Sequence, residues 1–334
     1  MGWKKIAGGA LLCGLAWLAL PARPARAQAE APAARFTATA STEYVTVPVV
    51  VRDRKGGFVR ELSRGDFRLW VEGKPVAIES FEKSDRASVS FAILLDVSGS
   101  MKIAEKLEHA KDAIRHLIRL RRPGDEFCLL TFSEDEIRIV AEFSTDPGPL
   151  LRQLFFLQPL GKTALFDAVA ETAATLGGKN AKKAILLFTD GVDNASQLKE
   201  SDLRRVMENE SVPVYAIGMK NASFDVLSEQ QRKELSVSAL DLVAKASGGR
   251  MFLVSGDTDL RPISEAIDGE LRRLYLLGFE PGGGDDIRYR PILVTVRGGG
   301  TRLIRARQGY RGTAARELPG SELAPRQKGR KEHS

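Results

Sequence analysis

Segments with the pattern of buried strands alternate with segments of helical periodicity along residues 89–274, and this alternation limits the possible folds most. Apolar runs of strand length lie at 89–95, 126–132, 136–142, 183–189, 213–219 and 250–254. Helical patterns lie at 102–120, 148–157, 164–177, 199–210, 236–246 and 258–274. This order predicts an α/β fold with a doubly wound, mostly parallel sheet and helices on both faces. Only residues 133–135 separate the second and third strands, which predicts a hairpin and one antiparallel edge strand.

Two further segments with β-strand patterns flank this region. Valines occupy every second position from Val45 to Val51, and Ile292, Val294 and Val296 show the same alternation. Neither segment has enough strands for independent stability, so we predict that the two pack together as one small β-sandwich unit. The predicted organisation is a signal peptide 1–27, a flexible leader 28–35, an N-terminal β unit 36–87, an α/β domain 88–274, C-terminal strands 275–311 and a disordered tail 312–334.

The first residues have the pattern of an export signal. Lys4 and Lys5 precede a short apolar stretch at 6–20, and a small-x-small cleavage site follows at 25–27. An uncleaved membrane anchor is the alternative, but the stretch is shorter than the roughly 20 residues of a spanning helix and ends at Pro21. We therefore expect an exported protein, periplasmic or extracellular, with no transmembrane segment after signal removal.

Charge and cysteine content exclude two classes of protein. The formal net charge of +7 comes from the two ends of the chain, so the body is close to neutral and no nucleic-acid partner is expected. Once the signal is removed, Cys128 is the only cysteine, which excludes an internal disulfide. Because Cys128 lies in an apolar strand, we expect a core thiol rather than a nucleophile.

Oxygen-bearing side chains follow two of the predicted strands. One apolar strand is followed directly by Asp96, Ser98 and Ser100, a later one is followed by Asp190, and Thr163 precedes a predicted helix. Ligands gather beyond the carboxyl ends of parallel strands, where the strand order reverses. We therefore expect these five side chains to lie together if the two strands are neighbours. Oxygen ligands suit a hard divalent cation such as Mg²⁺.

The same five residues allow other interpretations. The turn at 96–100, with its alternating hydroxyls, is a weak pattern when taken alone, because helix capping can explain it. A second alternative is a vestigial site, in which the domain keeps its fold but no longer binds the metal. A phosphate-binding loop at 161–163 is disfavoured because Phe156 stands where such a loop needs glycine. A phosphorylated Asp96 would need a second aspartate in place of Ser98. All five oxygen-bearing positions follow a buried strand or precede a predicted helix, and this shared context favours the metal site.

No histidine has the setting of a catalytic base. His109 and His116 fall on the first predicted helix, and His333 lies in the tail. None is suggested to lie beside a serine or cysteine nucleophile. We therefore predict that the protein is not an enzyme.

These five positions make the chain resemble the von Willebrand factor type A domain with its metal-ion-dependent adhesion site. The resemblance implies that Asp96, Ser98, Ser100, Thr163 and Asp190 hold the metal, with the carboxylates acting largely through waters. The expected ion is Mg²⁺, with Mn²⁺ and Ca²⁺ as alternatives. Residues 45–51, 66–67, 73–75, 275–279 and 305–310 also resemble exported acidobacterial-type VWFA-related proteins.

The ligand set determines the expected function. Mg²⁺ retains waters when protein ligands are few, and with few direct anionic ligands it keeps residual positive charge. A partner protein's Asp or Glu carboxylate can displace one of these waters, so we expect a protein-binding module in adhesion or assembly. The alternatives are an envelope scaffold in which the metal only stabilises the fold, and a subunit of a cytoplasmic AAA+ ATPase. The export signal argues against the ATPase subunit.

Overall fold

The computed structural model describes residues 45–83, 88–133, 136–177, 182–191, 193–210, 212–220, 237–255, 258–281, 288–297 and 303–311. The predicted signal peptide (1–27), leader (28–35) and tail (312–334) lie outside these residues. Among the described residues, no helix combines the length and the apolar character that crossing a membrane requires.

Six strands form a central sheet with the order β10-β9-β8-β5-β6-β7. Their bounds are β5 (Val89–Asp96), β6 (Glu126–Ser133), β7 (Glu136–Ser144), β8 (Lys182–Thr189), β9 (Val214–Lys220) and β10 (Arg250–Ser255). All neighbouring pairs are parallel except β6 and β7, which are antiparallel as their short connection requires. The order reverses between β5 and β8, so the two strands whose proximity the shared site requires are neighbours.

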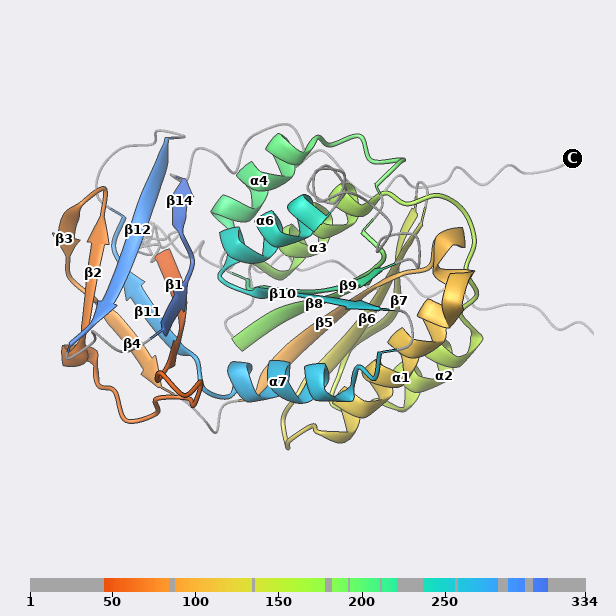
Figure 1. Ribbon diagram of the computed structural model, residues 1–334, viewed down its shortest axis with the longest axis horizontal. Helices are drawn as coiled ribbons and strands as arrows, with labels where there is room; N and C mark the ends of the chain where they lie inside the picture. Colours follow the sequence, from red (N-terminus) through yellow and green to blue (C-terminus); the bar gives the residue numbers. More distant parts are fainter. Residues whose placement is uncertain are drawn as a thin grey trace, which may run out of the picture. The chain divides into compact units, whose positions relative to one another are not determined.

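Helices cover both faces of this sheet (Figure 1). They are α1 (Lys106–Arg119), α2 (Gly148–Phe156), α3 (Leu165–Gly177), α4 (Glu200–Asn209), α6 (Val237–Ser247) and α7 (Arg261–Leu271). Apolar side chains of α1, α2 and α7 form one core with one face of the sheet, and those of α3, α4 and α6 form a second core with the other. Each helix therefore buries one apolar stripe.

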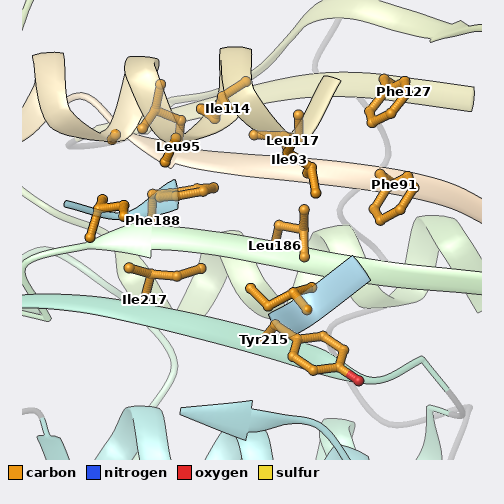
Figure 2. Close-up of a cluster of buried hydrophobic side chains, with 14 of the residues drawn as sticks. Phe91, Ile93, Leu95, Ile114, Leu117, Phe127, Leu186, Phe188, Tyr215 and Ile217 are labelled. Carbon is orange, nitrogen blue, oxygen red and sulfur yellow. The ribbon is translucent and has the colours of Figure 1, made fainter. Parts of the chain in front are cut away.

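Strand β5 supplies side chains to both cores. Every residue of β5 is buried, and its nearly continuous apolar run is typical of a parallel strand that is covered on both faces. Phe91 and Ile93 lie in one core and Ala92 in the other. Figure 2 shows the first of these cores, in which Ile93 gathers with Ile114 and Leu117 of α1. This packing fixes the end of β5, where Asp96 lies.

Two predicted helices are shorter than their sequence patterns suggested. The helix predicted at 102–120 begins only at Lys106, because a 3-10 segment (Gly99–Glu105) precedes it and Ala104 and Glu105 adopt left-handed backbone angles that cannot continue a helix. The helix predicted at 258–274 begins at Arg261, whose N–H binds the Asp259 carboxylate at 3.0 Å. In both cases the preceding turn determines where the helix starts.

The strands at the two ends of the chain pair with each other in two four-stranded sheets, β13-β1-β11-β4 and β14-β12-β2-β3. They are β1 (Val45–Arg52), β2 (Phe67–Val71), β3 (Lys74–Val76), β4 (Ser80–Lys83), β11 (Tyr275–Phe279), β12 (Tyr289–Val296), β13 (Leu303–Ala306) and β14 (Gly309–Arg311). Strand β1 pairs with β11 and β13, and β2 pairs with β12. Apolar side chains of both sheets form a third core.

Candidate metal-binding site

Asp96 ends β5, and its carboxylate is held from two sides. Its Oδ1 atom accepts a hydrogen bond from the Ser98 backbone N–H at 2.8 Å, and its Oδ2 atom accepts one from the Thr189 hydroxyl at 2.7 Å. Burial raises the pKa of Asp96 to about 6, although the hydrogen bonds from Ser98 and Thr189 lower it. The carboxylate is thus fixed between the ends of β5 and β8.

The two serines that follow Asp96 face each other. The hydroxyl oxygens of Ser98 and Ser100 are 3.1 Å apart. Ser98 is buried, and Ser100 is partly exposed beside the exposed Gly99. The loop therefore presents two neutral oxygen donors together where solvent reaches its edge.

Thr163 is brought to the same loop by backbone hydrogen bonds. The N–H of Gly99 donates to the carbonyl of Gly161 at 2.9 Å. The buried Thr163 is in turn clamped by Asn194: the Thr163 N–H donates to Asn194 Oδ1 at 2.8 Å, and the Asn194 N–H donates to the Thr163 carbonyl at 3.0 Å. Both polar backbone groups of Thr163 are therefore satisfied, and the backbone of Thr163 is fixed close to the serine loop.

Asp190 directly follows β8, and its carboxylate has two different environments. The Oδ2 atom accepts a hydrogen bond from Lys106 Nζ at 2.8 Å, and neither side chain of this pair is exposed (0% for both). Lys106 Nζ also donates to the Ser100 carbonyl at 3.3 Å, which ties Asp190 to the serine loop. Among the described residues, the buried Oδ1 atom of Asp190 has no hydrogen-bond partner.

These observations test whether the five residues fit a hard dication. A buried carboxylate oxygen without a partner is costly unless a further group satisfies it, and Asp190 Oδ1 is such an atom. The described residues contain no group of three or more His, Cys, Asp or Glu side chains placed to hold a metal. The donors that are present, two carboxylates and three hydroxyls, fit an ion that takes its remaining ligands from water. Their role as ligands stays a prediction.

Three residues of this region were not identified from the sequence as site residues. Thr189 positions Asp96, Asn194 positions Thr163, and Lys106 pairs with Asp190. A hydroxyl directly before Asp190 could have indicated Thr189. Lys106 lies on the apolar face of α1, one turn before Ala110, and a lysine at such a position needs a buried partner.

Two aspartates near these residues in sequence have structural roles instead. Asp167 accepts hydrogen bonds from the backbone N–H groups of Gln197 and Leu198 at 2.8 and 2.9 Å. Asp193 Oδ1 accepts one from the Ser196 N–H at 3.1 Å. Both carboxylates hold the loop between Asp190 and α4, so they order the segment that carries Asn194.

The mostly parallel sheet, with helices on both faces, defines an α/β domain, and polar side chains lie where its strand order reverses. Residues 91–192 match the family model of the von Willebrand factor type A domain, and this part of the chain is such a domain. An uncharacterised protein of Borreliella burgdorferi is 29% identical over 142 residues, which are 40% of this chain. The match spans 41% of that relative's length.

Solved structures of low sequence identity also match. A von Willebrand factor type A protein from Catenulispora acidiphila is 14% identical with a TM-score of 0.43, over 82% of this chain and 74% of that one. The von Willebrand factor domain of the type V pili tip protein Mfa5 from Porphyromonas gingivalis is 12% identical with a TM-score of 0.43. That match covers 55% of this chain and 94% of the pilus protein domain.

Proposed function

We propose that this chain is an exported, non-enzymatic protein-binding module of adhesion or assembly. In this proposal Asp96, Ser98, Ser100, Thr163 and Asp190 hold Mg²⁺, with Mn²⁺ and Ca²⁺ as alternative ions. The bound metal supplies a positive charge that attracts an Asp or Glu side chain of a partner protein. The chain's own residues hold the ion while leaving part of its charge unneutralised.

One observation carries the proposal: of the neighbouring strands β5 and β8, the first ends in Asp96 and the second is followed directly by Asp190, with hydroxyl groups in the adjoining loops. Of the five proposed ligands two are carboxylates, and one of these is already paired with Lys106. A dication at this position would keep net positive charge, because so little protein charge opposes it. Such a charge favours an external carboxylate over further hydroxyls.

Exposed apolar side chains next to the site support a protein partner rather than a small anion. Ile103 follows the serine loop and is 56% exposed, and Leu160 precedes Gly161 and is 78% exposed. The Leu160 N–H binds the Val97 carbonyl at 2.7 Å, which holds Leu160 beside the same loop. Exposed apolar side chains around a charged centre are typical of protein interfaces.

We also propose that the central sheet is doubly wound, that the end strands form a β-sandwich, that the α/β domain spans 88–274 and that the protein is exported. The strand order supports a doubly wound sheet, and the shared third core supports a β-sandwich of the end strands. The start of β5 at Val89 and of β11 at Tyr275 supports an α/β domain at 88–274. The basic and apolar pattern of residues 1–27 supports export.

The proposal is tested by titrating the mature protein with Mn²⁺ and measuring binding by calorimetry. We expect saturable binding to one site and a loss of at least about tenfold in affinity for Ser98→Ala, equivalent to about 1.4 kcal/mol. Ser264→Ala is the matched control, because Ser264 is also buried but donates to the Ala113 carbonyl on α1. Absence of any Mn²⁺ affinity in the wild-type protein would overturn the proposal.

Partner capture is measured separately with immobilised protein in Mg²⁺ and in EDTA. Proteins retained only in Mg²⁺ by the wild type, and lost with Ser98→Ala, are the expected result. If EDTA lowers the melting temperature but leaves the retained proteins unchanged, the scaffold alternative holds instead. Metal-dependent turnover of nucleotides or phosphoesters that Asp96→Ala abolishes would contradict the non-enzymatic assignment.

A further inference from the structure

Lys106 is a cation built into the candidate metal site. Its side chain is fully buried, and its ammonium group lies 2.8 Å from Asp190 Oδ2 and 3.3 Å from the Ser100 carbonyl. A buried ammonium is very costly without a partner, so the pair with Asp190 satisfies it. The same pair places an ammonium group next to two residues that are expected to bind a dication.

The two carboxylate oxygens of Asp190 have different hydrogen-bond environments. Lys106 occupies Oδ2, whereas Oδ1 is buried and has no hydrogen-bond partner among the described residues. Lys106 can therefore stay in place while Oδ1 accepts a hydrogen bond from a water on the metal. The charge of Asp190, however, is already balanced by Lys106.

We propose that Lys106 neutralises Asp190 and so weakens the binding of the metal itself while strengthening the pull of the bound metal on a partner's carboxylate. This inference rests on the proposed function and concerns the same site. With Lys106 present, the formal charge of the protein groups is one negative, so a bound dication leaves the site with one positive charge. Without Lys106, the two carboxylates would cancel the dication and remove the long-range attraction for an anion.

The test compares Mn²⁺ affinity, measured by calorimetry, in the wild type and in Lys106→Met, which keeps an unbranched side chain of similar size without the ammonium group. We expect the variant to bind Mn²⁺ about tenfold more tightly or better. The matched control is Lys111→Met, because Lys111 is also a buried lysine of α1 but binds Glu108 and the Leu157 carbonyl. Its Mn²⁺ affinity should equal that of the wild type.

A second readout uses acetate as the carboxylate probe. Acetate that displaces water from bound Mn²⁺ lowers the water-proton relaxivity of the loaded protein. We expect acetate to act at lower concentration on the wild type than on Lys106→Met, because only the wild-type site keeps net positive charge. The two measurements therefore change in opposite directions, which a purely structural role of Lys106 would not produce.

A double variant keeps the test valid if Lys106→Met fails to fold. Lys106→Met/Asp190→Asn removes both charges, whereas Asp190→Asn alone leaves the ammonium without its partner. We expect the double variant to bind Mn²⁺ at least about tenfold more tightly than Asp190→Asn. Equal affinities in this comparison would contradict the inference.

The outcomes separate this inference from the proposed function. Unchanged or weaker Mn²⁺ binding by Lys106→Met, with clear binding by the wild type, overturns the inference and leaves the proposed function standing. Binding by Lys106→Met but not by the wild type supports the inference and contradicts the proposed function. Absence of Mn²⁺ binding in all of these proteins overturns both.

Discussion

Asp96 shows how a single side chain can be placed before any ligand arrives. Its two oxygens accept hydrogen bonds from Ser98 and Thr189, yet burial still raises its pKa to about 6. Desolvation thus outweighs two hydrogen bonds, because the charged form has lost the water that would stabilise it. A dication would return that stabilisation, so charge on Asp96 and metal binding should be linked.

This linkage predicts a pH dependence. The metal-free folded protein holds a proton on Asp96 up to about pH 6, whereas the unfolded chain loses it near the ordinary pKa of 3.8. The contribution of Asp96 to the stability of the metal-free protein therefore falls as the pH rises from 3.8 to about 6. Because the metal needs the carboxylate, Mn²⁺ affinity should fall about tenfold for each pH unit below about 6. Calorimetric titrations from about pH 5 to about pH 7 measure this, and constant affinity would contradict it.

The 3-10 segment between Ser98 and α1 carries strain. Ala104 and Glu105 both have left-handed backbone angles, with φ of 52° and 53°, although neither is glycine. Such angles cost roughly 1–2 kcal/mol for a residue with a Cβ atom. Strained residues cluster at functional sites, and this pair connects the serine loop to Lys106. The turn brings Lys106 back to the serine loop, where its Nζ donates to the Ser100 carbonyl.

Replacing Ala104 with glycine tests this strain. Ala104→Gly should raise the free energy of unfolding by about 0.5–1 kcal/mol, because glycine adopts the left-handed conformation without a steric cost. The control Ala113→Gly, in the regular part of α1, should lower it by about 1 kcal/mol. Urea denaturation measures both values. A destabilised Ala104→Gly would show that the turn is not strained in solution.

Glu270 near the end of α7 joins the two parts of the fold. Its fully buried carboxylate contacts Arg52 of β1 at 2.9 Å, Arg250 of β10 at 3.2 Å and Arg305 of β13. Burial alone raises the pKa of Glu270, but the arginines, Arg305 foremost, bring it below its ordinary value. The charge is therefore retained in the folded protein, where it ties the central sheet to the end strands.

Neutralising this group should destabilise the whole fold. Glu270→Gln is expected to lower the free energy of unfolding by about 1–3 kcal/mol at neutral pH, because partly exposed arginines lose a charged partner. Since its folded pKa is lowered, the stabilisation by Glu270 is present above its ordinary pKa of 4.5 and is lost as the pH falls through the folded value. Urea denaturation at neutral and acidic pH measures the difference, which should shrink in acid.

Glu265→Gln is the control for this prediction. Glu265 lies on the same helix, but its side chain is 60% exposed and pairs with His116. Exposed ion pairs contribute little to stability, so this variant should stay within about 0.5 kcal/mol of the wild type. A loss for Glu265→Gln as large as that for Glu270→Gln would refute the role assigned to the buried carboxylate.

The local sequence pattern was sufficient to predict many of the strands of this protein. The apolar run before Asp96 predicted β5, and the run before Asp190 predicted β8, because a strand buried on both faces must be apolar throughout. Oxygen side chains close to the ends of those strands predicted a shared metal site, and the role of these residues as ligands stays a prediction. The pairing of the two β segments was also predicted from their small size, because so few strands are marginally stable alone.

Contacts between residues distant in sequence decided the rest. The sequence determined that Asp96 and Asp190 lie at the ends of two apolar runs of strand length. Only the tertiary structure shows that Lys106 pairs with Asp190, 84 positions away, and that Asn194 holds Thr163. Periodicity describes neighbours along one element. It carries no information on which side chain from another element satisfies a buried charge, because that depends on how the elements pack.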